Sequence, residues 1–152
     1  MKVVLQRVNS ANVKIDNTII SEIQTGVVLL WGIKKGDTVR DADVLIKKIV
    51  NLRIFSDSSG KMNKSIQEIS GQILLVSQFT LFAQTKKGNR PSFIQAAKPE
   101  MAMPIYEQTI AHFTQLMPNK IKTGVFAADM ELQLINDGPV TIIMDTKDKE
   151  RH

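Results

Sequence analysis

Residues 26–33 read GVVLLWGI, an apolar run that begins at a glycine and is followed by two lysines. Its length and its content of β-branched residues predict a strand that is buried on both faces. Residues 72–82 (QILLVSQFTLF) form a second candidate of the same kind.

Shorter strands are predicted on both sides of this pair. The candidates are residues 3–8, residues 11–15 and 18–23 around a turn at Asp16 and Asn17, a strand that begins within residues 52–55 before a turn at residues 56–61, and residues 131–135 and 140–144 joined by a turn at residues 136–139. Alternating apolar and polar residues favour strands, whereas clusters of Asn, Asp, Ser and Gly favour turns.

Two helices are predicted between the strands. The first has its cap at Asp37 or Thr38 and Asp41 in its first turn. Its apolar face consists of Ala42, Leu45, Ile46, Ile49 and Val50. The second covers residues 99–117, with an apolar face of Tyr106, Ile110, Phe113 and Met117. Because an interior proline breaks a helix, Pro104 is expected in or near the first turn.

A chain of 152 residues fits one domain and leaves little room for two. Many strands with two main helices predict a mixed, β-rich α/β fold, a single compact domain of packed sheets rather than a helix bundle or a Rossmann fold. We expect this domain to span residues 1–145, followed by a charged tail at residues 146–152. No run reaches the ~20 apolar residues of a membrane span, and the first apolar run is too short for a signal peptide. We therefore expect a cytoplasmic protein.

The composition narrows the chemistry. With 20 Lys and Arg against 15 Asp and Glu, the formal net charge is +5. Such a balance fits an anionic partner, most commonly nucleic acid, and it fits a merely soluble basic surface equally well. The absence of cysteine excludes disulfides, thiolate metal sites and cysteine nucleophiles.

Histidine is almost absent. His152 is the last residue of the charged tail, and His112 lies in the second predicted helix, where a surface or packing role is expected. A histidine metal site or a Ser-His-Asp triad therefore has little support, and no glycine-rich dinucleotide motif is present. We expect no metal and no cofactor. An enzyme of this composition needs an easy reaction, or catalytic groups from backbone or substrate.

Three polar residues, Ser77, Gln78 and Thr80, interrupt the second buried-strand candidate. Burying them is costly unless each finds a hydrogen-bond partner. They can be satisfied internally at the end of the strand, or they can form the floor of a pocket whose ligand supplies the partners. Thr80 is a conceivable nucleophile, although the sequence shows no base to activate it.

Two further segments leave alternatives open. Lys86, Lys87 and Arg90 form a basic loop that suits either a phosphate backbone or simple solvation. Residues 136–141 (NDGPVT) contain an Asp-Gly pair, which is a strong turn signal. Yet Pro139 opens a predicted strand although it cannot donate to its ladder. The sequence does not decide whether the Gly138-Pro139 bond is cis or trans.

Six segments together resemble the D-aminoacyl-tRNA deacylase family. They are QRVNSANV (residues 6–13), RIFSDSSGKMN (53–63), SQFTL (77–81), KGNRPSF (87–93), GVFAADM (124–130) and NDGPVT (136–141). They occur in the order of the family and cover nearly the whole chain, apart from the C-terminal extension. The Gly138-Pro139 pair favours the D-specific branch over relatives in which another residue precedes the proline.

The resemblance implies a homodimer with two active sites at the subunit interface. Gly138 and Pro139 would be joined by a cis bond and would reach into the site of the other subunit. Their carbonyl oxygens would accept from the substrate ammonium group, so that an L side chain collides with backbone. Glycine has no side chain to reject and should also enter. Arg7 would brace these carbonyls, since its guanidinium carries five donors.

The resemblance also implies the reaction, which is hydrolysis of the ester bond of D-aminoacyl-tRNA. Ser77 and Gln78 would hold the terminal adenosine, and the backbone N–H groups of Phe79 and Thr80 would form an oxyanion hole. The ribose 2′-OH of the tRNA would help to activate the attacking water. Lys86, Lys87 and Arg90 are weaker candidates for tRNA contacts. Two alternatives remain, an RNA-binding module without hydrolysis and an esterase with Thr80 as nucleophile.

Overall fold

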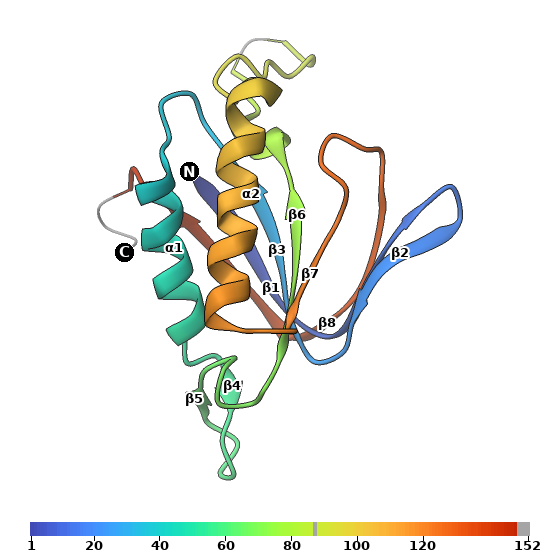
Figure 1. The fold of residues 1–152 in the computed structure, drawn as a ribbon, viewed down its shortest axis with the longest axis vertical. Coiled ribbons are helices and arrows are strands. Elements are labelled where there is room, and N and C mark those ends of the chain that lie inside the picture. Colours follow the sequence, from blue (N-terminus) through green and yellow to red (C-terminus); the bar gives the residue numbers. More distant parts are fainter. Residues whose placement is uncertain (87, 149–152) are drawn as a thin grey trace.

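The structure, a computed structural model, describes residues 1–86 and 88–148. Its elements are β1 (Lys2–Ile15), β2 (Thr18–Ile23), β3 (Gly26–Gly32), α1 (Val39–Asn51), β4 (Phe55–Ser56), β5 (Met62–Lys64), β6 (Gln72–Ser77), the 3-10 helix η1 (Phe79–Phe82), α2 (Pro99–Leu116), β7 (Ile121–Thr123) and β8 (Glu131–Asp145). The main sheet has the order β2-β1-β3-β6-β7, with β8 on the free edge of β1. Figure 1 shows α1 and α2 side by side against one face of this sheet. The mixed, β-rich fold predicted from the sequence is confirmed.

Strands β3 and β6 form the centre of the sheet and pair in parallel. In β3, Val27, Leu29 and Trp31 belong to the core under the helices, whereas Val28 belongs to a second cluster on the opposite face. In β6, Ile73 and Leu75 face the helices, and Leu74 and Val76 face the other way. Both strands are therefore buried on both faces, as their continuous apolar runs predict.

The first helix begins at the second of the two caps that the sequence allows. Its N-cap is Thr38, and the backbone N–H of Thr38 donates to Asp41 Oδ2 at 2.8 Å. This reciprocal contact satisfies a backbone donor that the first helical turn leaves free. The buried face is the predicted one and consists of Ala42, Leu45, Ile46, Ile49 and Val50.

The second helix differs from the prediction at Pro104. Pro99 begins α2, so Pro104 lies inside the helix, beyond its first turn. Tyr106 and Phe113 are buried as predicted, whereas Ile110 is only half-buried and the buried Thr109 was not predicted. The Tyr106 hydroxyl donates to the carbonyl of Leu75 at 2.9 Å and so fixes α2 to β6. Burial raises the pKa of Tyr106 well above its usual value.

The C-terminal hairpin predicted at residues 136–139 is wrong. Residues 131–145 form one strand, β8, which is antiparallel to β1 on both sides of this segment. Pairing jumps from Gln6↔Thr141 to Val8↔Asn136, so residues 137–140 of β8 stand opposite the single residue Arg7. Pro139 has no N–H for the ladder, which explains a bulge at this position. The Asp-Gly-Pro sequence, which is typical of a turn, here forms a bulge within a continuous strand.

The sequence also misplaced two strand ends. The first two predicted strands form a single strand, β1, which pairs with β3 along its first half and with β2 along its second. The predicted strand at residues 72–82 ends at Ser77 and continues as η1. The sheet curves back on itself, so that β2 and β7, at the two ends of the strand order, meet: the Ser21 hydroxyl in β2 donates to the Thr123 carbonyl in β7 at 2.6 Å.

Candidate active site

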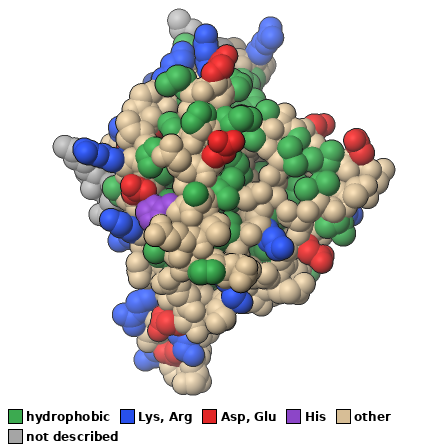
Figure 2. Space-filling view, viewed as in Figure 1, with side chains coloured by type: hydrophobic (Ala, Val, Ile, Leu, Met, Phe, Trp, Pro, Cys, Tyr) green, Lys and Arg blue, Asp and Glu red, His purple; other side chains and the backbone are tan. Residues whose placement is uncertain are grey.

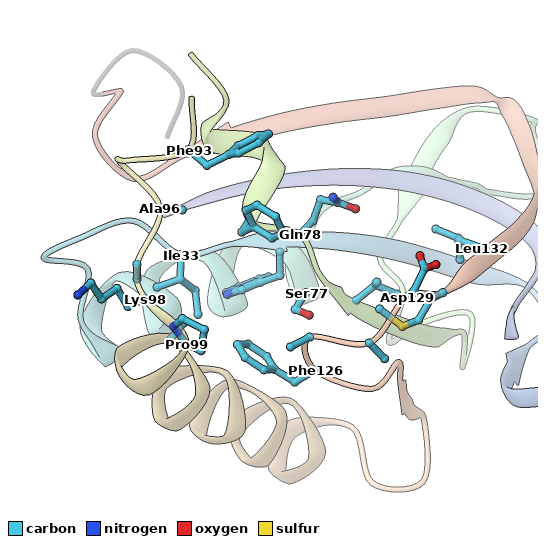
Figure 3. A pocket seen from close by; sticks show the side chains of 18 residues that line it. Ile33, Ser77, Gln78, Phe93, Ala96, Lys98, Pro99, Phe126, Asp129 and Leu132 are labelled. Atoms are coloured by element: carbon cyan, nitrogen blue, oxygen red, sulfur yellow. The ribbon is translucent and has the colours of Figure 1, made fainter. Parts of the chain in front are cut away.

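A cavity of about 560 Å³ opens beside the first turns of α2. It is lined by Trp31, Ile33, Val76, Ser77, Gln78, Phe79, Phe93, Ala96, Ala97, Lys98, Pro99, Ala102, Phe126, Ala127, Ala128, Asp129, Met130 and Leu132. Most of these side chains are apolar or aromatic, and Figure 3 shows how they surround the space. In the face shown in Figure 2, hydrophobic side chains gather in a band beside α2. An apolar cavity with few polar groups is the usual form of a small-ligand site.

The topology of the sheet explains the place of this cavity. Strands β3 and β6 run parallel, and Trp31 and Ser77 form their last pair. Both residues line the cavity, which therefore lies at the carboxyl ends of adjacent parallel strands. This is the edge at which open α/β sheets generally bind ligands, because the chain leaves the sheet there in loops.

Ser77 and Gln78 lie where the sequence predicts polar residues at a pocket. Both are half-buried and line the cavity. The backbone N–H of Gln78 donates to the Trp31 carbonyl at 2.8 Å, which ties the end of β6 to β3. The Gln78 side-chain amide donates to the Thr80 hydroxyl.

Phe79 and Thr80 begin η1 and are exposed. The Phe79 ring lines the cavity and packs edge-on against Phe93, with 5.2 Å between the ring centroids. In a 3-10 helix the first N–H groups have no acceptor within the helix. The backbone N–H groups of Phe79 and Thr80 therefore make no hydrogen bond inside η1. The Thr80 hydroxyl is not among the groups that line the cavity.

Residues 124–130 form one wall of the cavity. Sequence analysis did not predict that these residues line a site. Phe126, Ala128, Asp129 and Met130 all line the cavity. The segment GVFAADM stood out only through the family resemblance, because its residues carry no catalytic pattern of their own. A wall built by a loop distant from β6 in sequence is visible only when the chain is folded.

Arg7, Gly138 and Pro139 form a second cluster outside this cavity. The Gly138-Pro139 bond is cis, and both residues are exposed at the bulge of β8. Arg7 is buried, and its Nη1 donates to the carbonyl of Ile54 at 2.5 Å. Its Nε lies 2.9 Å from Asp137 Oδ2 as a charge pair, without hydrogen-bond geometry. None of these residues lines the cavity of its own chain.

The predicted basic loop lies apart from the cavity lining. Lys86 and Arg90 are exposed, and Lys87 lies outside the described residues. A short bridge between Gln84 and Ser92 closes the loop, with N–H to carbonyl distances of 2.8 and 3.0 Å. Residues 149–152 of the predicted tail, including His152, are likewise outside the described part of the chain.

His112 lies between the two helices rather than at the cavity. Its Nδ1 lies 2.7 Å from Asp43 Oδ1, which joins α2 to α1 away from the cavity. Among the described residues, no group of three or more His, Cys, Asp or Glu side chains is arranged to hold a metal ion. A search of the same residues for a helix of the length and hydropathy needed to cross a bilayer found none.

Comparison with known proteins gives a consistent result. The family model described as D-Tyr-tRNA(Tyr) deacylase matches residues 4–145. A D-aminoacyl-tRNA deacylase of Bacteroides fragilis (strain YCH46) is 57% identical over 150 residues, which cover 99% of this chain and 100% of the relative. A protein of the same name from Flavobacterium psychrophilum is 53% identical over the same coverage.

Solved structures share the fold. The c-Myc DNA Unwinding Element Binding Protein superimposes with a TM-score of 0.90 at 41% identity, covering 95% of this chain and 98% of the other. A probable eukaryotic D-amino acid tRNA deacylase gives a TM-score of 0.77 over 94% and 97%, and at 16% identity it supports the fold alone.

The fold, the cavity and these matches define the chain as a hydrolase of the deacylase class. Within that class, it belongs to the D-Tyr-tRNA(Tyr) deacylase family. The resemblance inferred from the sequence is confirmed. Family membership also favours a hydrolase over the alternative of an RNA-binding module without chemistry.

Proposed function

We propose that the chain hydrolyses the ester bond of D-aminoacyl-tRNA and releases the free D-amino acid and tRNA. One observation carries this proposal. Ser77, Gln78 and Phe79 converge on an apolar cavity in a chain whose relatives are named D-aminoacyl-tRNA deacylases. The volume of about 560 Å³ lies within the range of small-ligand sites and suits the terminal adenosine with its ester.

Within this proposal, the aromatic and apolar walls receive the flat adenine base, and Ser77 and Gln78 hold the adenosine by hydrogen bonds. The ester carbonyl then lies at the start of η1. The amides of Phe79 and Thr80 have no acceptor inside the 3-10 helix, which supports their use as donors to the oxyanion. Donors of this kind act strongly because they are fixed before the reaction begins.

The attacking water needs a group to orient it, and His112, the one histidine among the described residues, does not line the cavity. We propose that the ribose 2′-OH of the terminal nucleotide has this role. An aminoacyl ester is an activated bond, so positioning and oxyanion stabilisation supply much of the required acceleration. Replacing the terminal ribose by 2′-deoxyribose should then abolish turnover, whereas unchanged turnover would remove this step.

Chirality is proposed to be read by Gly138 and Pro139 of a second copy of the chain. Their carbonyl oxygens would face the substrate α-carbon, exclude an L side chain and admit D-aminoacyl and glycyl groups. Two observations support this arrangement. Both residues are exposed on a bulge, and they lie on β8, which pairs only with β1 among the described strands. β8 also exposes the apolar side chains of Ile135 and Ile143, which favours burial against another surface.

Arg7 would keep this bulge in place. It anchors the bulge through its charge pair with Asp137 and is itself tied to the Ile54 carbonyl. A Cβ added to Gly138 would lie only 3.0 Å from Arg7 Nη2, so the bulge packs closely on the guanidinium. Lys86 and Arg90 are proposed as weaker contacts to the tRNA backbone, on the strength of their charge and exposure.

The proposed reaction is tested with D-Tyr-tRNA and L-Tyr-tRNA under identical conditions. Hydrolysis of the D form alone is expected, and equal hydrolysis of both forms, or of neither, would refute the proposal. Gly-tRNA should be cleaved as well. Sedimentation should show a dimer, since one chain does not bring Gly138 to its own cavity.

A mixing experiment tests whether the site is shared between subunits. Gln78→Ala impairs the cavity, and Gly138→Ala places a methyl group beside the proposed position of the substrate α-carbon, so each variant alone should lose activity on D-Tyr-tRNA. If each site combines Gln78 of one chain with Gly138 of the other, a hybrid dimer retains one intact site. Random exchange of equal amounts should then restore about a quarter of wild-type activity. No recovery in verified hybrid dimers would contradict a shared site.

A further inference from the structure

We propose that Asp129 is a substrate-binding residue whose carboxylate binds the α-ammonium group of the aminoacyl ester. The enzyme would thereby select substrates with a free amino group over N-acylated aminoacyl-tRNA and peptidyl-tRNA, in which the α-nitrogen is an uncharged amide. This inference rests on the proposed function of the cavity and assigns one of its walls a role.

Asp129 lies in the wall of the cavity. Among the described residues that line the cavity, it is the only acidic one. Figure 3 shows Asp129 toward one end, on the same side as Gln78, whereas Lys98 lies at the other end and extends away. The two ends of the cavity therefore differ in charge. The negative end is the one on the side of Gln78, which is proposed to hold the adenosine that carries the ester.

The Asp129 carboxylate has no partner among the described residues and is therefore free to bind a ligand. No hydrogen bond or ion pair to it is found within residues 1–86 and 88–148, and the residue is exposed. Other aspartates are held by partners. Asp41 accepts from Thr38, Asp43 pairs with His112, Asp57 accepts from Ser59 and Asn63, and Asp137 pairs with Arg7. An exposed carboxylate that only solvent satisfies can exchange that water for a cationic ligand, which gives it a charge-assisted hydrogen bond.

The loop that carries Asp129 is hydrogen-bonded to the central sheet. The Gly124 N–H donates to the Leu75 carbonyl in β6 at 3.0 Å, which anchors the start of the loop. Ala127 adopts a positive φ of 61°, a conformation that is rare for residues with a side chain. Such residues concentrate where function requires a particular backbone path. Here that path places Ala127, Ala128 and Asp129 in succession along the cavity wall.

The substrate offers the Asp129 carboxylate one cationic group, the α-ammonium. At the acylated 3′ end, the α-ammonium is the positive charge common to all amino acids, whereas the ribose and adenine are neutral. An ammonium group has three donors, so a carboxylate and the backbone carbonyls of a second copy can share it. Charge-assisted hydrogen bonds are about twice as strong as neutral ones. Asp129 would thus hold the amino group while the main chain reads the configuration at the α-carbon.

The test compares two substrates and two variants of the full-length protein. Asp129→Asn removes the charge with little change in shape, and Glu131→Gln removes a nearby exposed charge that does not line the cavity. D-Tyr-tRNA carries the ammonium, and the analogue charged with the corresponding α-hydroxy acid carries a hydroxyl in its place. We expect Asp129→Asn to lower kcat/KM about tenfold on D-Tyr-tRNA, the scale of one charged hydrogen bond in a partly exposed site.

On the hydroxy analogue the same variant should stay within about twofold of wild type, and Glu131→Gln should stay within about twofold on both substrates. An equal loss on both substrates would show that Asp129 supports the loop rather than the ammonium, and no loss on either would remove it from the site. Both results overturn the inference while the wild-type protein still cleaves D-Tyr-tRNA. Failure of the wild-type protein on D-Tyr-tRNA would instead overturn the proposed function, and this inference with it.

Discussion

Replacing Arg7 by alanine should destabilise the fold and disturb the bulge at Gly138 in one step. The guanidinium donates to the Ile54 carbonyl, and a buried hydrogen bond from a charged group contributes about 1.5–3 kcal/mol. Its pair with Asp137, whose side chain is 41% exposed, adds about 0.2–1 kcal/mol. Arg7→Ala should therefore lower the free energy of unfolding by about 2–4 kcal/mol.

Urea unfolding followed by circular dichroism measures this change directly. For a domain of this size, each kcal/mol corresponds to roughly 2–4 °C in Tm. Arg40→Ala is the matched control, because Arg40 is exposed and no hydrogen bond or ion pair to it is found in the described part of the chain. The control should stay within about 0.5 kcal/mol of wild type. If Arg7→Ala behaved like this control, the anchoring of the bulge by Arg7 would be wrong.

Three further changes test other parts of the structure. A Cβ on Gly26 would lie 1.9 Å from the Gln72 carbonyl oxygen, so Gly26→Ala should destabilise the β3–β6 pair by about 3 kcal/mol or more in urea unfolding. Thr80→Ala should keep its deacylation rate within about tenfold, whereas a loss of about 10⁴-fold or more would identify Thr80 as the nucleophile. Hydrogen bonds from Ser59 and other donors hold the pKa of Asp57 well below its usual value. The ionised carboxylate therefore stabilises the β4–β5 hairpin above its ordinary pKa, and this contribution is lost as pH falls through the folded-state pKa. Asp57→Asn should thus increase amide exchange in the hairpin at neutral pH, and the difference from wild type should shrink in strong acid.

Local patterns predicted the elements whose stability is local. The face of α1 follows from a spacing that any amphipathic helix must show, and its cap follows from Thr38 and Asp41. The double-sided burial of β3 follows from an apolar run with no polar alternation. In these cases the information lies within one segment, so the sequence was sufficient.

Residues 136–139 were misread because turn composition does not encode chain direction. A glycine and a proline break a ladder in the same way whether the chain then reverses or continues. The choice was made by β1, which pairs with β8 on both sides of the bulge. Pro104 illustrates the same limit, since the helix that begins at Pro99 continues through a proline in its interior. The cavity wall at residues 124–130 could not be predicted, because it exists only where that loop meets β6.

The geometry of β8 bears on how the two clusters can act on one substrate. Leu132 lines the cavity, and Gly138 follows six positions later on the same strand. At ~3.3 Å per residue, the extended part of β8 carries Asn136, where the bulge begins, about 13 Å from Leu132. Moving the bulge to its own cavity would break the ladder with β1, which pairs with β8 on both sides of Arg7. This geometry supports the proposal that the Gly138 carbonyl at each ester comes from a second chain. The antiparallel edge and exposed isoleucines of β8 offer the surface through which a second chain would do so.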